Sequence, residues 1–553
     1  MRAAAATVVG ALAISAGASC SRASKPFDSR ADAGNGVVDF GSDSGIHACQ
    51  LADQSRSSVG CEYYAIHMDG TFGADNGCFV AYVANTFDQA THLDVSFDGT
   101  AIDLGQYAKI PRGGGRSMAY DDYDPVAGLA PRQVAILFLA GLAQPGAVTP
   151  GDISDPVPCP VAPALSALTQ VHGTGIGRAF RIRTDYPVVA YQMLPFGGGS
   201  AAVTGATLLL PTSVFGTNYL AVNAYVGGDR AGTAQTSMNI VAAQDGTEVT
   251  IRPKVAILAG NGVDGADPNA PTTYKLNAGQ HLQVTQGQEL TGSPIASNKP
   301  IGLFAGHPCM DVPVGAPYCD HGEQQIPPIH AMGNEYAAVT HRARTSAPEN
   351  PPWRIIGAVD GTTLVYEPSV GGPQTVGLGD VVEFRTSVPF TVKSQDADHP
   401  FLLVTYMTGA STTGSAYGDA DFVRAVPSPQ YLDRYIFFTD PTYPETNLVV
   451  TRRRHDGVFS DVALDCAGTL GGWAPIGTSG DYEYTRIDLV RHDFQKQGAC
   501  DNGRHEMTSP KPFGVTVWGW GTSETAIFTG YVSYGYPAGQ NVAPLTSIVV
   551  PPR

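Results

Sequence analysis

The chain is poor in charge, and basic residues are the scarcer kind. Charged residues make up 15% of its 553 residues, and 33 Lys and Arg stand against 50 Asp and Glu, for a net charge of −17. Nucleic-acid binding needs clustered Lys and Arg to neutralise phosphates. The one basic cluster, Arg452–Arg454, is three residues long, so the sequence argues against a nucleic-acid partner.

Helical periodicity is also nearly absent, and no apolar run after the N-terminus reaches membrane-spanning length. Apolar and polar residues alternate instead, as in FRIRTDYPVVAYQ and PFGVTVWGW, which is typical of half-buried strands. The 65 Gly and 41 Pro fit tight turns between short strands. A chain of this length is too long for a single hydrophobic core, so we expect about three to five domains. We therefore expect an all-β, antiparallel protein.

Motifs that carry catalysis are missing as well. The sequence has no G-x-S-x-G nucleophile elbow, no phosphate-binding loop and no C-x-x-C pair. HEMTS begins like a zinc-protease helix at His505 but has Ser509 where the second histidine belongs. We expect no enzyme, and a secreted hydrolase is the least favoured reading.

The first residues resemble an export signal. Arg2 precedes the apolar stretch AAAATVVGALAISA, and GASC follows. GASC is similar to a bacterial lipobox, although Gly17 stands where Leu is usual. We expect a signal peptide over residues 1–19, lipid attachment at Cys20, and a flexible tether over residues 20–45. Cleavage after Ala18 is the alternative. We therefore expect a protein that is either held at a bacterial outer membrane or cell surface by its lipid anchor, or secreted.

Cysteine parity supports the lipid anchor. Of nine cysteines, eight remain once Cys20 is set aside, enough for four disulfides in an exported protein. Cys309 with Cys319 and Cys466 with Cys500 are the expected pairs in the second half. The first half leaves three connectivities open among Cys49, Cys61, Cys78 and Cys159.

Two signals repeat at long range. A turn followed by an apolar strand recurs at Pro187, Pro300, Pro400 and Pro512, at successive separations of 113, 100 and 112 residues. Asp-Gly dipeptides, which favour hairpins, recur at Asp98, Asp245, Asp360 and Asp456. The repeats predict four related β modules, over residues 46–210, 211–333, 334–425 and 426–543, with a tail over 544–553. The modules are expected to be sandwich-like, and a ring resembling a propeller is the alternative.

The stretch CDHGEQQIPPIH, Cys319 to His330, concentrates the residue types of a site. A Pro pair forbids a continuous helix through it, so the helical zinc spacing is absent. We interpret it as a loop stapled by Cys309–Cys319, with His321 and Glu323 as weak metal candidates. The loop NGVDGADPN offers Asp264, Asp267 and Asn269 as weak oxygen ligands, for which calcium would be the cofactor.

Two aromatic residues lie two apart in VTVWGWG. Trp518 and Trp520 share one face of a predicted strand. They are weak candidates for a binding platform, and core packing is the favoured interpretation.

The order of several motifs resembles the family of the IgGFc-binding protein N-terminal domain. The similarity runs through GCEYYAIHMD, LLLPTSVFGTNYL, IVAAQDGTEVTI and GHPCMDVPVGAPYCDHGEQQIPP to SYGYPAG, about residues 60–540. The resemblance implies an extracellular, disulfide-bearing binding domain and brings no catalytic residues.

From these features we expect a non-enzymatic surface or secreted adhesion protein. It would recognise an extracellular protein or glycan through loops on the repeated modules. A structural component of the cell surface or matrix is the alternative.

Overall fold

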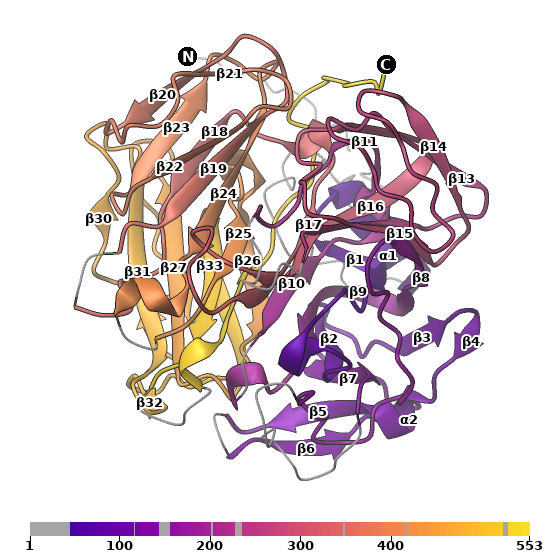
Figure 1. Cartoon of the computed structure of the whole chain (residues 1–553). Helices are drawn as coiled ribbons and strands as arrows, with labels where there is room; N and C mark the ends of the chain where they lie inside the picture. Colours follow the sequence, from indigo (N-terminus) through magenta and orange to yellow (C-terminus); the bar gives the residue numbers. More distant parts are fainter. Residues whose placement is uncertain are drawn as a thin grey trace, which may run out of the picture.

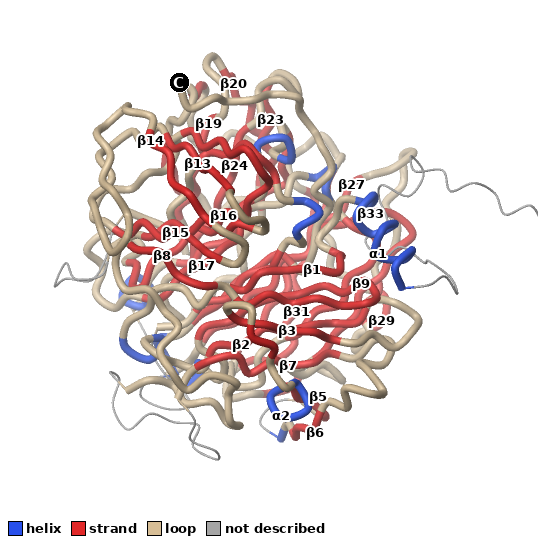
Figure 2. Tube along the Cα trace, turned by 90° about the vertical axis from the view of Figure 1, so that its right-hand side faces the viewer, coloured by secondary structure: helices blue, strands red, loops and turns tan. Residues whose placement is uncertain are grey.

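A computed structural model describes residues 45–114, 117–142, 155–200, 203–226, 235–346, 349–414, 417–523 and 529–553. It confirms the all-β class. Helix is confined to α1 (Gly45–Ser55), α2 (Leu104–Tyr107) and single 3-10 turns within the described part of the chain, and Figure 2 shows these as short pieces among strands. No helix in these ranges is long and apolar enough to cross a membrane. The expected signal peptide, Cys20 and the tether up to residue 44 lie outside the described residues.

Four consecutive parts of the chain, here called modules 1 to 4, each build an inner sheet with the same strand order. The last strand of each module lies next to a long strand, which in module 3 is divided into two separate strands. The module's second strand and a fourth strand follow in the sheet. From the centre outward, these inner sheets are β10 (Gly205–Leu209), β9 (Phe180–Leu194), β2 (Phe79–Asn85) and β7 (Val134–Ala140); β17 (Asp320–Ile326), β16 (Pro294–Met310), β12 (Ser237–Ala242) and β15 (Gln280–Thr285); β25 (Asp421–Arg424), β24 (Phe401–Met407), β19 (Pro352–Gly357) and β22 (Val381–Arg385); and β34 (Ser533–Pro537), β33 (Arg504–Trp520), β27 (Glu445–Arg453) and β31 (Tyr482–Arg491).

Each module also has an outer sheet, formed by its first strand and a hairpin on the two sides of the long strand's beginning. The outer strands are β1 (Val59–Ala65), β3 (Leu93–Phe97) and β4 (Thr100–Ala101); β11 (Gly216–Leu220), β13 (Thr247–Ile251) and β14 (Thr272–Leu276); β18 (Glu335–Ala338), β20 (Thr362–Glu367), β21 (Thr375–Val376) and β23 (Phe390–Ser394); and β26 (Leu432–Phe438), β28 (Ala463–Leu464) and β29 (Gly468–Thr469). Five further strands extend the sheets at their margins: β5 (Ala108–Arg112), β6 (Ala119–Asp122), β8 (Gly175–Arg178), β30 (Ala474–Pro475) and β32 (Gln495–Lys496).

The repeated prolines mark the corner where each long strand passes from the outer to the inner sheet. In β9, residues 180–184 pair with β3, whereas residues 188–193 pair with β2, and Pro187 stands between the two stretches. Pro300 takes the same place in β16, and Pro400 separates β23 from β24. Proline has no N–H to donate, so it interrupts a ladder where the strand must change partners.

The Asp-Gly repeats behave differently from one another. Asp98 and Gly99 form a two-residue hairpin turn between β3 and β4, with both residues at positive φ, and Asp456 and Gly457 close a similar turn between the bridged His455 and Val458. The hairpin prediction is wrong at Asp245 and Asp360. There the dipeptide leads from an inner strand to an outer one, and the two strands do not pair.

The four modules form a closed ring. The last strands touch in cyclic order, β10 with β17, β17 with β25, β25 with β34, and β34 with β10. Figure 1 shows the four groups of strands around a centre where β10, β17 and β25 lie. Each module is thus a two-layer, sandwich-like unit, and the units are arranged about one axis, so the two architectures left open by the sequence occur together.

The two ends of the described chain close this ring. Ser58 donates its backbone N–H to Gln540 at 2.7 Å, and Val542 donates to Arg56 at 2.6 Å. The hydrophobic core also crosses module boundaries: one buried cluster joins β2 and β9 of module 1 to β26, β27 and β34 of module 4, and another joins modules 2 and 3. The expected module limits, 46–210, 211–333, 334–425 and 426–543, stay a prediction about folding units.

Four disulfides secure the modules. They join Cys49 to Cys61, Cys78 to Cys159, Cys309 to Cys319 and Cys466 to Cys500. The last two are the expected pairs, and the first two select one of the three connectivities left open. Such crosslinks are typical of proteins that fold in an oxidising compartment.

Candidate functional site at the centre of the ring

The stretch CDHGEQQIPPIH is the axial strand of module 2 rather than a loop. The disulfide Cys309–Cys319 closes the preceding loop, but Asp320–Ile326 forms β17, and all seven residues are buried. The loop interpretation is wrong for these residues. The polar composition gave no sign of a strand. Because β17 lies at the centre of the ring, its side chains face backbone groups of other modules, and polar side chains can form hydrogen bonds with these groups.

The glutamines of β17 show this directly. Gln324 donates to the backbone carbonyls of Ala206 and Gly535, at 3.2 and 2.8 Å, in modules 1 and 4. Gln325 accepts from the Leu210 N–H at 2.6 Å. Hydrogen bonds of this kind replace the sheet ladder that the last strand of a module lacks on its inner side.

Asp320 is the point where most modules meet. Its carboxylate accepts from the backbone N–H of Thr204 in module 1, from its neighbour His321 at 2.9 Å, and from Ser533 in module 4 at 3.0 Å. The Ser533 hydroxyl also donates to the carbonyl of Asp419 in module 3, at 2.9 Å. One carboxylate and one serine therefore connect all four modules.

Other carboxyl groups surround this point without access to water. Asp419 and Asp421 are fully buried at the start of β25. Burial raises the pKa of Asp419 to about 7, and burial together with the charges of Asp419 and Asp421 raises the pKa of Asp320 well above its usual value. The Asp419 Oδ1 accepts two backbone N–H groups, from Ala410 and Ala420, at 3.0 and 2.9 Å.

His321 and Glu323, the weak metal candidates, lie side by side in this interior. The His321 Nε2 is 3.8 Å from a Glu323 carboxylate oxygen, which also accepts from Gln192 at 2.7 Å. Both side chains are fully buried, and burial raises the pKa of Glu323. No third His, Cys, Asp or Glu of the described residues completes a compact ligand set with them.

One end of the axis is covered by the loops that lead into the four last strands. The backbone N–H of Gly409, in the β24–β25 loop, donates to Val312, in the β16–β17 loop, at 2.7 Å. The ring of Tyr318 in the stapled loop packs at a tilt against that of Tyr531 in the β33–β34 loop, with ring centroids 4.7 Å apart. We call this end, formed by residues 198–200, 203–204, 311–319, 408–414, 417–420, 521–523 and 529–532, the loop face.

The loop face exposes apolar side chains on a constrained backbone. Val314 is 61% exposed and Tyr318 is 53% exposed, on a loop closed by a disulfide. Other valines, such as Val365 and Val458, are also exposed, and scattered exposed apolar side chains are normal for a protein surface. The sequence did not single out Tyr318 or Tyr531, although an aromatic residue directly before a disulfide cysteine is a signal that could have pointed to Tyr318.

The acidic loop NGVDGADPN lies far out on module 2. Asp264, Asp267 and Asn269 are exposed, the Asp264 carbonyl accepts from the Tyr274 hydroxyl at 3.2 Å, and the Asp267 carbonyl accepts from Ala270 in a turn. These contacts are those of an ordinary polar turn, and calcium binding there stays a prediction.

The tryptophans are part of the core. Trp518 and Trp520 are both fully buried, and both rings pack against His341. The platform interpretation is therefore wrong for this structure, and the favoured interpretation holds. The cause is that this face of β33 packs against module 3, whose Ala337, Met407 and Val423 lie in the same buried cluster.

A hollow of about 370 Å³ lies beside the Cys49–Cys61 disulfide. Two of its acidic side chains form ion pairs: Glu62 with Arg181, and Asp185 with His92.

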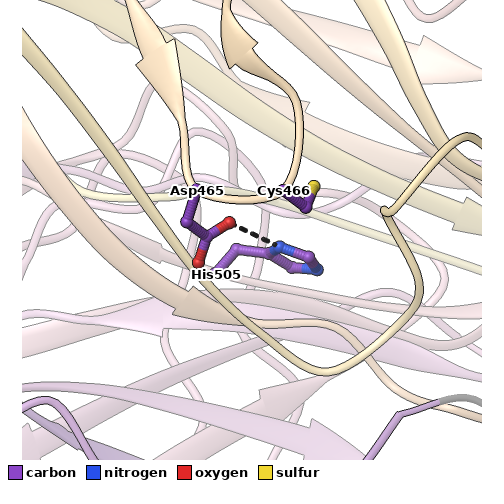
Figure 3. Close-up of side chains that lie close together, drawn as sticks. All are labelled: Asp465, Cys466 and His505. Carbon is purple, nitrogen blue, oxygen red and sulfur yellow. Dashed lines mark hydrogen bonds and ion pairs between the residues drawn. The ribbon is translucent and has the colours of Figure 1, made fainter.

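A compact group of metal-ligating residue types lies in module 4. One ligand atom of each of Asp465, Cys466 and His505 lies within 4.8 Å of those of the other two. Figure 3 shows the three side chains grouped together. Cys466 is bonded to Cys500, so its sulfur is not a thiolate in this structure.

Comparisons with known proteins identify the family to which the chain belongs. A family model described as IgGFc binding protein matches residues 205–519, more than half of the chain. Human IgGFc-binding protein is 24% identical over 340 residues, a match that covers 60% of this chain but 6% of the human protein. The chain thus spans a small part of that relative's length, and no solved structure matches it. On the strength of the family match, the chain belongs to the IgGFc-binding protein family.

Proposed function

We propose that this protein is a non-enzymatic extracellular binding protein and that the loop face is its contact surface. The observation that carries the proposal is the convergence of loops from four modules at one end of the ring, with Val314 and Tyr318 exposed there. Rigid scaffolds commonly carry recognition on such loops.

The residue types on the loop face favour a protein partner. Tyrosine is enriched at protein interfaces because it buries a large ring at a small cost in conformational entropy. The disulfide Cys309–Cys319 and the contact between the Tyr318 and Tyr531 rings restrict the loops before binding, which lowers the entropic cost of binding. The human relative's name supplies the first probe, the Fc fragment of immunoglobulin G.

The proposed location follows from the sequence expectations. Lipidation at Cys20 and the tether up to residue 45 would hold the ring clear of a bacterial outer membrane or cell surface, with membrane contact through the lipid alone. Adhesion between surfaces is the biological role that this arrangement serves. Metabolic labelling with a fatty-acid analogue, lost in Cys20→Ala, would show the lipid.

A capture experiment tests the proposed function. The exported chain, with its disulfides intact, is immobilised and exposed to immunoglobulin Fc, a glycan array and surface extract of the producing organism, with and without EDTA. A specific protein partner resistant to EDTA supports the proposal. Loss of binding in EDTA would point to calcium at Asp264, Asp267 and Asn269 instead. Glycan capture would change the partner class, and self-association alone would favour a structural component of the surface.

A further inference from the structure

The group Asp465, Cys466 and His505 is held by regular structure on both sides. Asp465 and Cys466 form the turn between β28 and β29, and His505 lies in β33, which pairs with β28. Cys500 precedes β33 and is bonded to Cys466. The His505 side chain is 5% exposed and the Asp465 side chain 32% exposed, so solvent reaches the group through Asp465. Figure 3 shows how the three side chains lie.

The hydrogen bonds of His505 fix which ring nitrogen carries the proton. Nε2 lies 2.7 Å from the backbone carbonyl oxygen of Asp501, which can only accept, so Nε2 bears the hydrogen. In the neutral ring Nδ1 then presents a lone pair, and it faces Asp465 Oδ1 at 3.2 Å. Two lone pairs in this position need a cation between them, either a proton or a metal ion.

The separation of these two atoms suits a metal ion. At bond lengths of about 2.0–2.1 Å, two ligands on a tetrahedral zinc lie about 3.3–3.4 Å apart. The outer hydrogen bonds are also those of a metal site: Asp501 orients the imidazole, and the second oxygen of Asp465 accepts from the Glu506 N–H at 2.9 Å. Two ligands are thus oriented, and the sulfur of Cys466, which is bonded to that of Cys500, lies within 4.8 Å of a ligand atom of each.

We propose that reduction of the disulfide Cys466–Cys500 creates a zinc site in which Cys466, Cys500, His505 and Asp465 are the four ligands. A disulfide sulfur carries no negative charge and binds zinc poorly, whereas a thiolate is a preferred ligand. The disulfide therefore decides whether the site exists.

The chemistry balances with an external dithiol as the reductant. The dithiol supplies two electrons and two protons: the Cys466–Cys500 bond breaks, each cysteine becomes a thiol, and the reductant closes its own disulfide. When Zn²⁺ binds, the two thiols release two protons to solvent. The sulfurs need to part only to about 3.7 Å, the separation of two thiolates on one tetrahedral zinc.

The surroundings fit the charge of such a site. Two thiolates and one carboxylate leave one negative charge on the zinc complex, and the Arg504 guanidinium lies 3.1 Å from Asp465 Oδ2. Among the residues that the structure describes, no other group of three His, Cys, Asp or Glu lies within 4.8 Å, so the other three disulfides lack such partners.

Metal titration of the full chain tests the proposal. The protein is reduced with a dithiol under argon, freed of reductant, and titrated with Co²⁺ and then Zn²⁺. We expect about one equivalent of Co²⁺ with thiolate charge-transfer absorption, displaced by Zn²⁺, and no such binding before reduction. His505→Gln should weaken Zn²⁺ binding at least about tenfold, and the double variant Cys309→Ala, Cys319→Ala should bind as the wild type does. Equal affinity in His505→Gln, or equal binding before reduction, overturns the proposal.

Alkylation mapping of the wild-type chain gives a second test that needs no variant. Bound Zn²⁺ should protect Cys466 and Cys500 from iodoacetamide in the reduced protein while Cys309 and Cys319 react. Protection that is absent, or equal at both pairs, contradicts the zinc site.

Discussion

At the residue scale, the ring depends on a few buried polar side chains. Asp320 accepts from modules 1 and 4, and Arg424, also fully buried, donates to the Gln325 carbonyl of module 2 at 2.6 Å and to Gln540 near the C-terminus. Burial lowers the pKa of Arg424 to about 9. Buried polar groups of this kind are costly when a partner is removed, so they fix how the modules face one another.

The first prediction concerns the charge of Asp419. Folding raises its pKa from 3.8 to about 7. The stability that this shift contributes to the folded state is therefore fully present below about pH 4 and is lost as the pH rises towards 7. Asp419→Asn keeps the acceptor for Ala410 and Ala420 and removes the charge. Relative to wild type, the variant should gain about 2 kcal/mol in free energy of unfolding between pH 5 and pH 7.5, measured by urea unfolding at both values.

The comparison with wild type is needed because histidines act in the opposite sense. Burial lowers the pKa of His67, His281 and His341 to about 3, 3 and 4, so they destabilise the folded state below about pH 6.5 in both proteins. A variant whose advantage is the same at pH 5 and pH 7.5 would show that Asp419 does not change its protonation state between these pH values, contrary to the raised pKa.

At the element scale, the repeated unit is a long strand with a proline corner held by a tyrosine. In each module a tyrosine of the first strand donates its hydroxyl to the residue after the repeated proline: Tyr63 to Val188, Tyr219 to Ile301, Tyr336 to Phe401 and Tyr435 to Phe513. Three of these tyrosines follow a repeated P-x4-[GL]-x2-Y pattern that starts at Pro211, Pro328 and Pro427. This pattern is a sequence signal of the module starts that our sequence analysis missed.

The second prediction tests this contact. Tyr336→Phe removes a hydroxyl that donates to the Phe401 carbonyl at 2.6 Å and accepts from Gly333 at 3.2 Å, and it leaves both groups buried. We expect a loss of about 2 kcal/mol in the free energy of unfolding. Tyr318→Phe, on the loop face, is the matched control and should change it by less than about 0.5 kcal/mol. Equal effects would mean that the corner does not depend on the hydroxyl.

Elements were easier to predict than the site. The alternation of apolar and polar residues and the turn signals predicted the strand content, and the repeated prolines predicted four modules. Both kinds of signal depend on local backbone chemistry, which the sequence shows directly. β17 escaped because its sequence DHGEQQI has no apolar alternation; its burial comes from modules that are about a hundred residues away in the chain. Core packing of Trp518 and Trp520, by contrast, was the favoured interpretation of the sequence, and both side chains are buried.

At the scale of the whole molecule, the arrangement of the modules depends on ring closure. The last residues bond back to the start of module 1 and to module 2: Gln540 to Ser58, Val542 to Arg56, and Val550 to Asn218. Each module's inner edge meets a neighbour, so closure removes edges that would otherwise remain open for aggregation.

The third prediction concerns the closing segment. A chain ending at Pro537 loses these bonds and the buried side chains of Val542 and Val550. We expect a loss of at least about 3 kcal/mol in the free energy of unfolding and a larger hydrodynamic radius by size-exclusion chromatography. Removal of Pro551–Arg553 alone, which are at least partly exposed, should change neither quantity. A Pro537-ending chain that stays as compact and stable as wild type would argue against closure by this segment.

The most direct test of the account is the affinity of the captured partner for loop-face variants, measured by surface plasmon resonance. The double variant Val314→Ser, Tyr318→Ala removes the exposed apolar side chains and leaves the Cys309–Cys319 loop closed. Val365→Ser, on module 3, is the control at a similarly exposed site. The account predicts that the double variant binds at least about tenfold more weakly and that Val365→Ser binds as wild type does. Unchanged affinity in the double variant, with both proteins folded, would contradict the loop face as the contact surface.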